Sequence, residues 1–483
     1  MVIDALKYQI LQQFGFVPTE EQGQALDAFA RFLTDRDPDA VMILRGSAGT
    51  GKTFLSGAIV RTLKAIRQKV MLLAPTGRAA KVFSLNSGCP AYTIHRRIYR
   101  EKSFAGVDGQ FNLNDNLFTD TLFMVDEASM ISNLGLGGGN FGSGCLLDDL
   151  VRFVYQGHND RLMLIGDKAQ LPPVGEEESP ALNRMMLEGY GLKVYECDLN
   201  EVLRQSQESG ILYNATVIRQ MITHDDITQL PLIRFKGFAD IVMMPGNELV
   251  ESLANSYYRV GQDETMVITR SNKRANIYNN GIRNMVLDRE DELSCGDMLM
   301  IVKNNYFWTE KERNEAKEAL NAIPPFLANG DRAKVLRVSR HMELYGFRFA
   351  TLLLQFPDYD NYEMSVTALL DTLQSEAPAL THEQQEQLFH GVEEDYQDVP
   401  LKADRMKAIR GDQYFNALQV KYAYAITCHK AQGGQWEHVY VDQGYMTDDM
   451  LTPDYIHWLY TAFTRAKDKL FLVNWPKTQT EQA

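Results

Sequence analysis

The sequence lacks the features of a membrane protein, a disulfide-stabilised protein or a zinc protein. Its 483 residues contain no apolar run near the ~18 residues that a membrane-spanning helix needs. Its five cysteines are scattered singly, never with Cys-x-x-Cys spacing, which argues against a disulfide framework and a zinc site. Residues 3–14 have helical spacing and lack the unbroken apolar core of a signal peptide. We therefore expect a docking helix there, in a cytoplasmic protein.

A positive net charge is also lacking. Lys and Arg total 49 against 63 Asp and Glu, which gives a formal net charge of −14. This balance argues against a protein that coats nucleic acid everywhere, but it allows a basic channel inside an acidic exterior, because phosphate affinity depends on local charge. The length suits roughly three or four domains of about 150 residues, and the hydrophobic fraction of 45% is ordinary for a globular chain.

The chain does contain a phosphate-binding loop directly after a buried strand. The apolar run 41–44 precedes the loop, and a helix is expected to begin near Lys52. Backbone N–H groups of such a loop wrap a polyphosphate, Lys52 reaches the β- and γ-phosphates, and Thr53 binds Mg²⁺. The loop residues predicted to bind the nucleotide are Gly46, Ser47, Ala48, Gly49, Thr50, Gly51, Lys52 and Thr53. A nucleotide site is therefore favoured over a chance glycine-rich turn.

Two further apolar strands deliver polar residues suited to nucleotide hydrolysis. Asp126 and Glu127 follow the strand 121–125. An Asp at the carboxyl end of a strand beside a phosphate loop serves Mg²⁺, and the adjacent Glu orients the attacking water. Gln170 comes after the strand 162–165 and is a candidate for contacting the γ-phosphate.

A glutamine upstream of the loop has two alternative roles. Thr19 and Gln22 stand at capping-box spacing at the start of a helix. Gln22 also lies one short helix before the phosphate loop. Its amide offers a donor and an acceptor, which suits the N6 and N7 edge of adenine.

The rest of the chain indicates a hairpin, a second α/β domain and a β-rich insert. Asp108-Gly109 is flanked by aromatic residues, which is a hairpin signal. A strand–helix pattern starts afresh near Val194 and resumes at Leu418. Between about 297 and 415 the chain has short β-like runs. It also carries the acidic stretch 376–398, which we interpret either as a partner-docking element or as a solvated face.

Taken in order, these motifs resemble superfamily 1B helicases of the Dda and RecD type. The segments that carry the resemblance are 19–22, 46–53, 74–80, 93–95, 126–129, 166–173, 203–205, 427–433 and 460–466. The resemblance implies an α/β fold of two RecA-like P-loop domains with parallel sheets and ATP between them. It also implies a β-hairpin pin in the first domain and an SH3-like β-rich insertion in the second. The predicted domains are 1–193 with the pin at about 98–120, 194–296 together with 416–483, and the insert 297–415.

The resemblance also assigns residues to roles. Arg204 and Arg465 cross from the second domain to stabilise charge on the γ-phosphoryl group, their alternative being a surface salt bridge. Gln435 stands near the ribose, where many RecD-type sequences have Glu. The positions expected to touch single-stranded DNA are Pro75, Thr76, Thr93, His95, Thr427 and His429. Phe104 and Phe111 belong to the strand-separating pin, or alternatively to a plain hydrophobic hairpin tip.

The sequence therefore predicts an ATP- and Mg²⁺-dependent DNA helicase that moves 5′→3′ on single strands and unwinds forked duplex as a monomer. The direction rests on the resemblance alone. Two alternatives stay open: a DNA-stimulated ATPase that acts as a switch or loading factor without unwinding, and a helicase subunit of a nuclease–helicase complex. The sequence does not decide between DNA and RNA.

Overall fold

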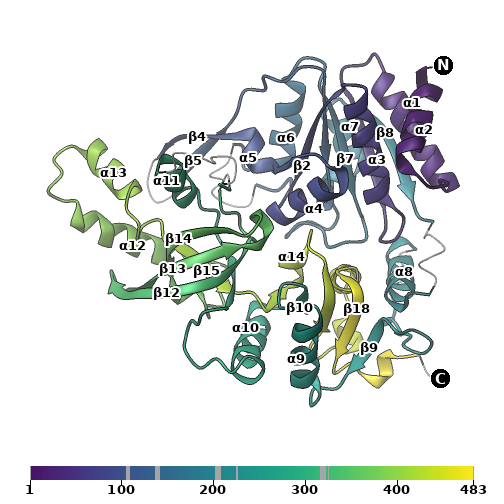
Figure 1. Ribbon diagram of the computed structural model, residues 1–483. Coiled ribbons are helices and arrows are strands. Elements are labelled where there is room, and N and C mark those ends of the chain that lie inside the picture. The colour runs from purple at the N-terminus through teal and green to yellow at the C-terminus, as the bar shows by residue number, and fades with distance from the viewer. Residues whose placement is uncertain are drawn as a thin grey trace.

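Among the described residues, the strands form two open parallel sheets, one closed barrel and one two-stranded hairpin (Figure 1). The computed structural model describes residues 2–104, 109–135, 142–201, 208–224, 227–315, 323–324 and 326–481. For residues 2, 101–104, 109–111 and 448 it describes the backbone only. In that part of the chain, no helix has the length and apolar character needed to cross a membrane.

The first sheet has six parallel strands in the order β3-β2-β6-β7-β1-β8. The strands are β1 (Ala40–Gly46), β2 (Lys69–Ala74), β3 (Ala91–Thr93), β6 (Thr121–Val125), β7 (Arg161–Gly166) and β8 (Lys193–Leu199). Its helices are α1 (Val2–Phe14), α2 (Glu20–Thr34), α3 (Lys52–Ala65), α4 (Gly77–Ser87), α5 (Ile94–Ile98), α6 (Leu146–Tyr155) and α7 (Arg184–Gly189). We call this sheet with its helices the first lobe.

Alternate residues of β1 face opposite sides of the first sheet. Met42 and Leu44 pack in a core with α1, α2 and α3. Val41 and Ile43 pack in a second core with α5 and α6. Helices thus cover both faces, as a parallel sheet requires. The expected N-terminal docking helix is confirmed, because α1 buries Ile10 in the first of these cores.

The second sheet has five parallel strands in the order β16-β10-β17-β18-β9. The strands are β9 (Ile241–Met244), β10 (Thr265–Thr269), β16 (Ala425–Thr427), β17 (Trp436–Asp442) and β18 (Ala466–Val473). Its helices are α8 (Gly210–Thr223), α9 (Leu249–Arg259), α10 (Asn272–Gly281), α14 (Cys428–Ala431) and α15 (Pro453–Phe463). We call this sheet with its helices the second lobe, and two RecA-like lobes match the predicted fold class.

The β-rich insert is a closed, SH3-like barrel, again as predicted. Its strands are β11 (Met298–Ile301), β12 (Arg332–Leu344), β13 (Phe347–Phe356), β14 (Tyr362–Leu369) and β15 (Leu418–Tyr422). Helix α11 (Phe307–Glu315) follows β11. The acidic stretch 376–398 contains the whole of α12 (His382–Asp395), which packs with α13 (Lys402–Arg410) at the far end of β12 and β13 through Leu388, Val392 and Ile409.

Two strands lie outside the domains that we predicted for them. β8 was assigned to the second domain, but it pairs with β1 in the first sheet from Ala40↔Lys193 to Gly46↔Leu199. β15 was also assigned to the second domain, but it closes the barrel by pairing with β11 and β14. The boundary at 193/194 therefore falls one residue into β8 and the boundary at 415/416 falls just before β15, although each strand belongs to the preceding unit. Strand partners far away in sequence decide this membership.

A buried ion cluster fixes the point where the chain enters the barrel. Asp297 is fully buried and accepts a bidentate pair of hydrogen bonds from Arg283, each 3.0 Å long. It also accepts from Arg289 at 2.8 Å and from the Tyr424 hydroxyl at 2.9 Å. The second sheet and the barrel share one hydrophobic core around this cluster.

We predict that Asp297→Ala lowers the free energy of unfolding by about 3–5 kcal/mol, because it leaves the buried Arg283 guanidinium without its anion. Urea unfolding followed by circular dichroism measures the change. Glu290→Ala, which removes an exposed carboxylate nearby, is the control and should be near neutral. Equal urea midpoints for the two variants would contradict the prediction.

Candidate nucleotide and nucleic-acid site

The predicted phosphate loop connects β1 to α3, and α3 begins at Lys52 as expected. Gly49 and Gly51 have φ of 78° and 80°, which is left-handed backbone that favours glycine. A Cβ on Gly46 would come within 2.9 Å of both Lys52 Cγ and Thr50 Oγ1. The loop therefore has room only for glycine at its first position, as a tight cradle around phosphates requires.

The predicted acidic pair lies at the carboxyl end of β6. The Glu127 amide donates to Asp126 Oδ1 at 2.9 Å, and Glu127 has a φ of 53°, a strained conformation for a side chain of this type. Desolvation and the neighbouring Glu127 raise the pKa of Asp126 to about 7, and the Lys52 cation opposes this shift. Such a carboxyl group needs a cation beside it to stay ionised at neutral pH.

The donor set at this place fits Mg²⁺ better than a transition metal. Within the described ranges, no group of three or more His, Cys, Asp or Glu residues is arranged to hold a metal ion. Mg²⁺ is typically held by one or two carboxylates together with substrate phosphates. Asp126 and Thr53 suit that role, and it stays a prediction.

Gln170 lies in the loop after β7 and is 7% exposed. Its side-chain carbonyl oxygen is buried and has no hydrogen-bond partner among the described residues. A buried acceptor without a donor calls for an additional group such as water. Because a carbonyl oxygen can only accept hydrogen bonds, this atom suits a water molecule, and the contact of Gln170 with the γ-phosphate stays a prediction.

The second lobe contacts the phosphate loop through α15. The Tyr460 hydroxyl accepts the Ala48 N–H at 3.0 Å and donates to Asp167 at 2.6 Å. The Leu171 backbone is held on both sides, since its N–H donates to Thr461 Oγ1 at 2.8 Å and its carbonyl accepts from the Gln432 amide at 2.7 Å. We call these contacts the seam between the lobes. The sequence analysis missed Tyr460, although the residue lies in the segment 460–466 that carried the resemblance.

Two arginines of the second domain, Arg204 and Arg465, were predicted to act as arginine fingers. Arg204 lies outside the described residues. Arg465 is 2% exposed, and its guanidinium donates to carbonyl oxygens of Thr461 at 3.0 Å and Gly434 at 3.2 Å, and to the Thr464 hydroxyl at 3.1 Å. All of these acceptors belong to the second lobe. The finger role of both arginines stays a prediction.

Gln22 forms the predicted capping box with Thr19. Its amide oxygen accepts the Thr19 N–H, and its amide nitrogen donates to the Thr50 carbonyl of the phosphate loop, both at 3.0 Å. Gln22 therefore links the start of α2 to the phosphate loop, a role that the sequence did not indicate. The contact of Gln22 with adenine stays a prediction. The backbone carbonyl of Gln435 accepts a hydrogen bond from Arg78 at 2.9 Å, and the contact of Gln435 with the ribose also stays a prediction.

Three of the predicted DNA-contacting residues are helix N-caps at strand ends. The side chains of Thr76 and Thr93 cap α4 and α5, and Thr427 stands at the N-cap position of α14 without a side-chain hydrogen bond. In the first lobe, Thr93 pairs with Ala74, the last residue of β2, and Pro75 follows directly after it. In the second lobe, Thr427 is the last residue of β16. Ligands of parallel α/β sheets bind at the carboxyl ends of strands, and helix N-termini favour anions. This edge of both sheets therefore suits a phosphate backbone.

The two histidines of this edge are neutral at pH 7. Desolvation lowers the pKa of His95 to about 4, against the opposing charge of Asp149. Desolvation also lowers the pKa of His429, with Asp454 opposing. Both side chains therefore act as neutral hydrogen-bonding groups. A cation at this edge is Lys430, whose pKa desolvation lowers to about 8 and whose Nζ has no hydrogen-bond partner in the described part of the chain.

The predicted hairpin is present as β4 (Tyr99–Phe104) paired antiparallel with β5 (Gly109–Leu113). Its tip, 105–108, lies outside the described residues, and so do the side chains of Phe104 and Phe111. The strand-separating role of the two aromatic residues stays a prediction.

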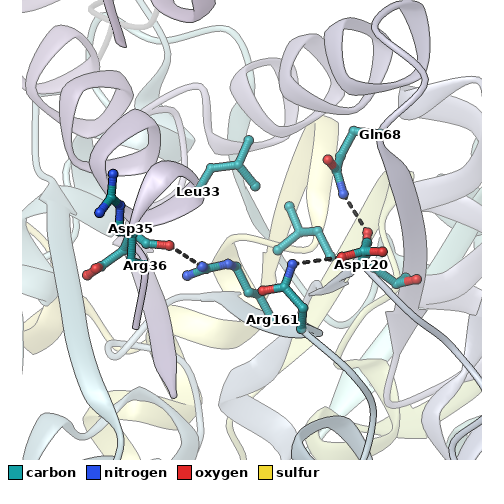
Figure 2. A pocket seen from close by; sticks show the side chains of 9 residues that line it. Leu33, Asp35, Arg36, Gln68, Asp120 and Arg161 are labelled. Carbon is teal, nitrogen blue, oxygen red and sulfur yellow. Dashed lines mark hydrogen bonds between the residues drawn. The ribbon is translucent and has the colours of Figure 1, made fainter. Parts of the chain in front are cut away.

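A pocket of 550 Å³ lies at the opposite end of the first sheet, near the amino ends of β6 and β7 (Figure 2). Arg161 donates to the Phe32 carbonyl at 3.0 Å and also to the Asp35 carbonyl. Gln68 donates to the Asp120 carbonyl at 2.6 Å, and Asn159 donates to the Asp120 carboxylate at 2.7 Å. The polar groups of the pocket are hydrogen-bonded to protein atoms around the starts of β6 and β7. The pocket is therefore separate from the nucleotide site.

Two protein families match the lobes. The family described as AAA domain matches residues 19–220, and the family described as UvrD-like helicase C-terminal domain matches residues 422–473. The chain combines an AAA domain with a UvrD-like helicase C-terminal domain. Together with the RecD2 DNA helicase relative reported below, these matches confirm the predicted resemblance to helicases of the RecD type.

Individual proteins align over parts of the chain. An uncharacterized protein of Methanocaldococcus jannaschii is 33% identical over 171 residues, which cover 33% of this chain and 14% of that protein. The ATP-dependent RecD2 DNA helicase of Deinococcus radiodurans is 30% identical over 157 residues, which cover 32% of this chain and 18% of that protein. The aligned part thus spans less than a fifth of either relative. A crystal structure of Pif1 helicase from Bacteroides with ADP-AlF3 and ssDNA aligns over 97% of this chain and 95% of that chain, at 13% identity and a TM-score of 0.47.

We predict that acidification destabilises the protein partly through His95. Between pH 6.5 and about 4 the unfolded chain binds a proton at this residue that the folded chain does not, so the free energy of unfolding falls as the pH falls through this window. His95→Gln should reduce the loss between pH 7 and 5 by about 1–2 kcal/mol. Urea unfolding at the two pH values measures it, with the exposed His382→Gln as control. An unchanged pH dependence in His95→Gln would refute the assignment.

Proposed function

We propose that this protein is an ATP-dependent DNA helicase that hydrolyses ATP at the seam between its lobes. The observation that carries the proposal is the contact of Tyr460 with the Ala48 N–H, because it places α15 of one lobe on the phosphate loop of the other. A nucleotide held there is shared by both lobes. The UvrD-like helicase match and the RecD2 helicase relative favour unwinding over other uses of ATP.

The residues of the first lobe suit the hydrolytic step. Lys52 holds the β- and γ-phosphates. Thr53 and Asp126 would hold Mg²⁺, which would supply positive charge beside the phosphates. Glu127 orients the attacking water, and the buried Gln170 carbonyl oxygen accepts a hydrogen bond from it. Arg204 and Arg465 supply positive charge from the second lobe. Arg465 must leave its carbonyl partners to do so, which couples hydrolysis to closure of the lobes.

The nucleic-acid strand lies across the strand ends of both lobes. Thr76 and Thr93 belong to the first lobe and Thr427 to the second, so closure changes the spacing between the points that hold the backbone. Contacts with phosphates and sugars give little sequence preference and strong salt dependence. We propose 5′→3′ movement of a monomer on single-stranded DNA, with unwinding of forked duplex. The direction rests on the resemblance to superfamily 1B.

Lys52→Ala should abolish ATP turnover and leave single-stranded DNA binding intact, because the phosphate loop follows β1, whereas Thr76 and Thr93 lie at the ends of β2 and β3, on the far side of β6 and β7 along the same sheet edge. Phosphate release and the anisotropy of a labelled oligonucleotide measure the two activities. Lys64→Ala, which changes an exposed lysine on the same helix, is the matched control. DNA-stimulated hydrolysis that persists in Lys52→Ala would refute the site.

Forked duplexes that carry a single 5′ or a single 3′ tail test the direction. We expect strand separation from the 5′-tailed substrate only. Separation only from the 3′ tail would overturn the direction, while DNA-stimulated hydrolysis without separation from either tail would favour the switch or loading factor.

A further inference from the structure

An arginine that the sequence analysis did not select reaches the phosphate loop from the second lobe. Arg219 lies near the end of α8, which packs against α15 and lies between the two lobes in Figure 1. Its Nη1 donates a hydrogen bond to the Ser47 hydroxyl of the loop. The guanidinium also lies 3.4–3.5 Å from the Asn200 carbonyl, at the end of β8.

The surroundings of Arg219 leave its charge without an anion. In the part of the chain that the structure describes, Arg219 forms no ion pair, and its Nε is buried without a hydrogen-bond partner. A guanidinium has five N–H donors, so two acceptors, of which the Asn200 carbonyl is distant, leave it undersatisfied. A partly buried cation in this condition is costly unless an anion joins it.

The position of Lys52 indicates which anion this is. The Lys52 ammonium donates to the Ser47 carbonyl at 2.9 Å, so two cations from two lobes converge on Ser47. The lysine of such a loop reaches the β- and γ-phosphates. An anion that satisfies Arg219 at this residue therefore lies at the same end of the polyphosphate.

We propose that Arg219 binds the terminal phosphate of the nucleotide held by the loop, and that it discriminates nucleoside triphosphate from diphosphate. This inference rests on the proposed function and names a catalytic residue for it. Arg219 differs from Arg465, whose guanidinium is satisfied by three acceptors of its own lobe. Arg219 reaches the loop without any rearrangement of α8.

The test compares Arg219→Ala and Arg219→Lys with the wild-type protein. Steady-state hydrolysis with single-stranded DNA gives kcat and KM, and titration with ADP and with a non-hydrolysable ATP analogue gives two affinities. For Arg219→Ala we expect kcat to fall by about 10²–10³. Affinity for the analogue should fall by more than about tenfold, while that for ADP changes by less than about threefold. Arg219→Lys should restore part of the analogue affinity, because a point charge replaces the fork.

Arg234→Ala is the matched control, since Arg234 belongs to the second lobe, is 46% exposed and pairs with Glu481 away from the loop. Wild-type kinetics in Arg219→Ala would overturn the inference. Equal losses of ADP and analogue affinity would also overturn it, because they indicate a contact that only holds the seam together. If Arg219→Ala does not fold, the ratio of the two affinities in Arg219→Lys decides. A wild-type protein that hydrolyses no ATP would instead refute the proposed function.

Discussion

Hydrogen bonds across the seam hold the two lobes in one arrangement around the phosphate loop. The Tyr460 hydroxyl joins the Ala48 N–H to the Asp167 carboxylate, and both Tyr460 and Asp167 are almost fully buried. Breaking such a bond leaves a buried polar group unsatisfied, which costs about 1–3 kcal/mol. Phosphates that use the Ala48 N–H must take it from Tyr460, so binding at the loop acts directly on α15.

The seam continues from the nucleotide site to the strand ends. Arg78 of α4 stacks on Trp436 of β17 with 4.6 Å between the guanidinium carbon and the ring centroid. At Gly433, a Cβ would come within 3.0 Å of the Ala79 side chain and 3.1 Å of the Thr76 hydroxyl. The second lobe thus packs closely against the start of α4, next to a residue predicted to contact DNA. Packed side chains thus connect the phosphate loop with this edge.

Local patterns predicted the parts of the site that depend on neighbouring residues. The phosphate loop and the capping box at Gln22 are set by short spacing, and both are present as expected. Partners far away in sequence decided the rest. From the sequence, β8 was predicted to begin the second domain, but it pairs with β1 of the first sheet. β15 was predicted to be a strand of the second parallel sheet, but it pairs with β11 of the barrel. Arg219 has no motif of its own, and only the position of α8 against the first lobe brings it to Ser47.

The central claim is that nucleotide at the seam moves one lobe against the other. The distance between spin labels tests it most directly, with labels at the exposed positions Leu85 on α4 and Tyr258 on α9 in a chain without its five cysteines. We predict that a saturating non-hydrolysable ATP analogue shifts the distance distribution in this protein but not in its Lys52→Ala variant. A distribution that is the same with and without the analogue, at a concentration shown to fill the site, would contradict the account.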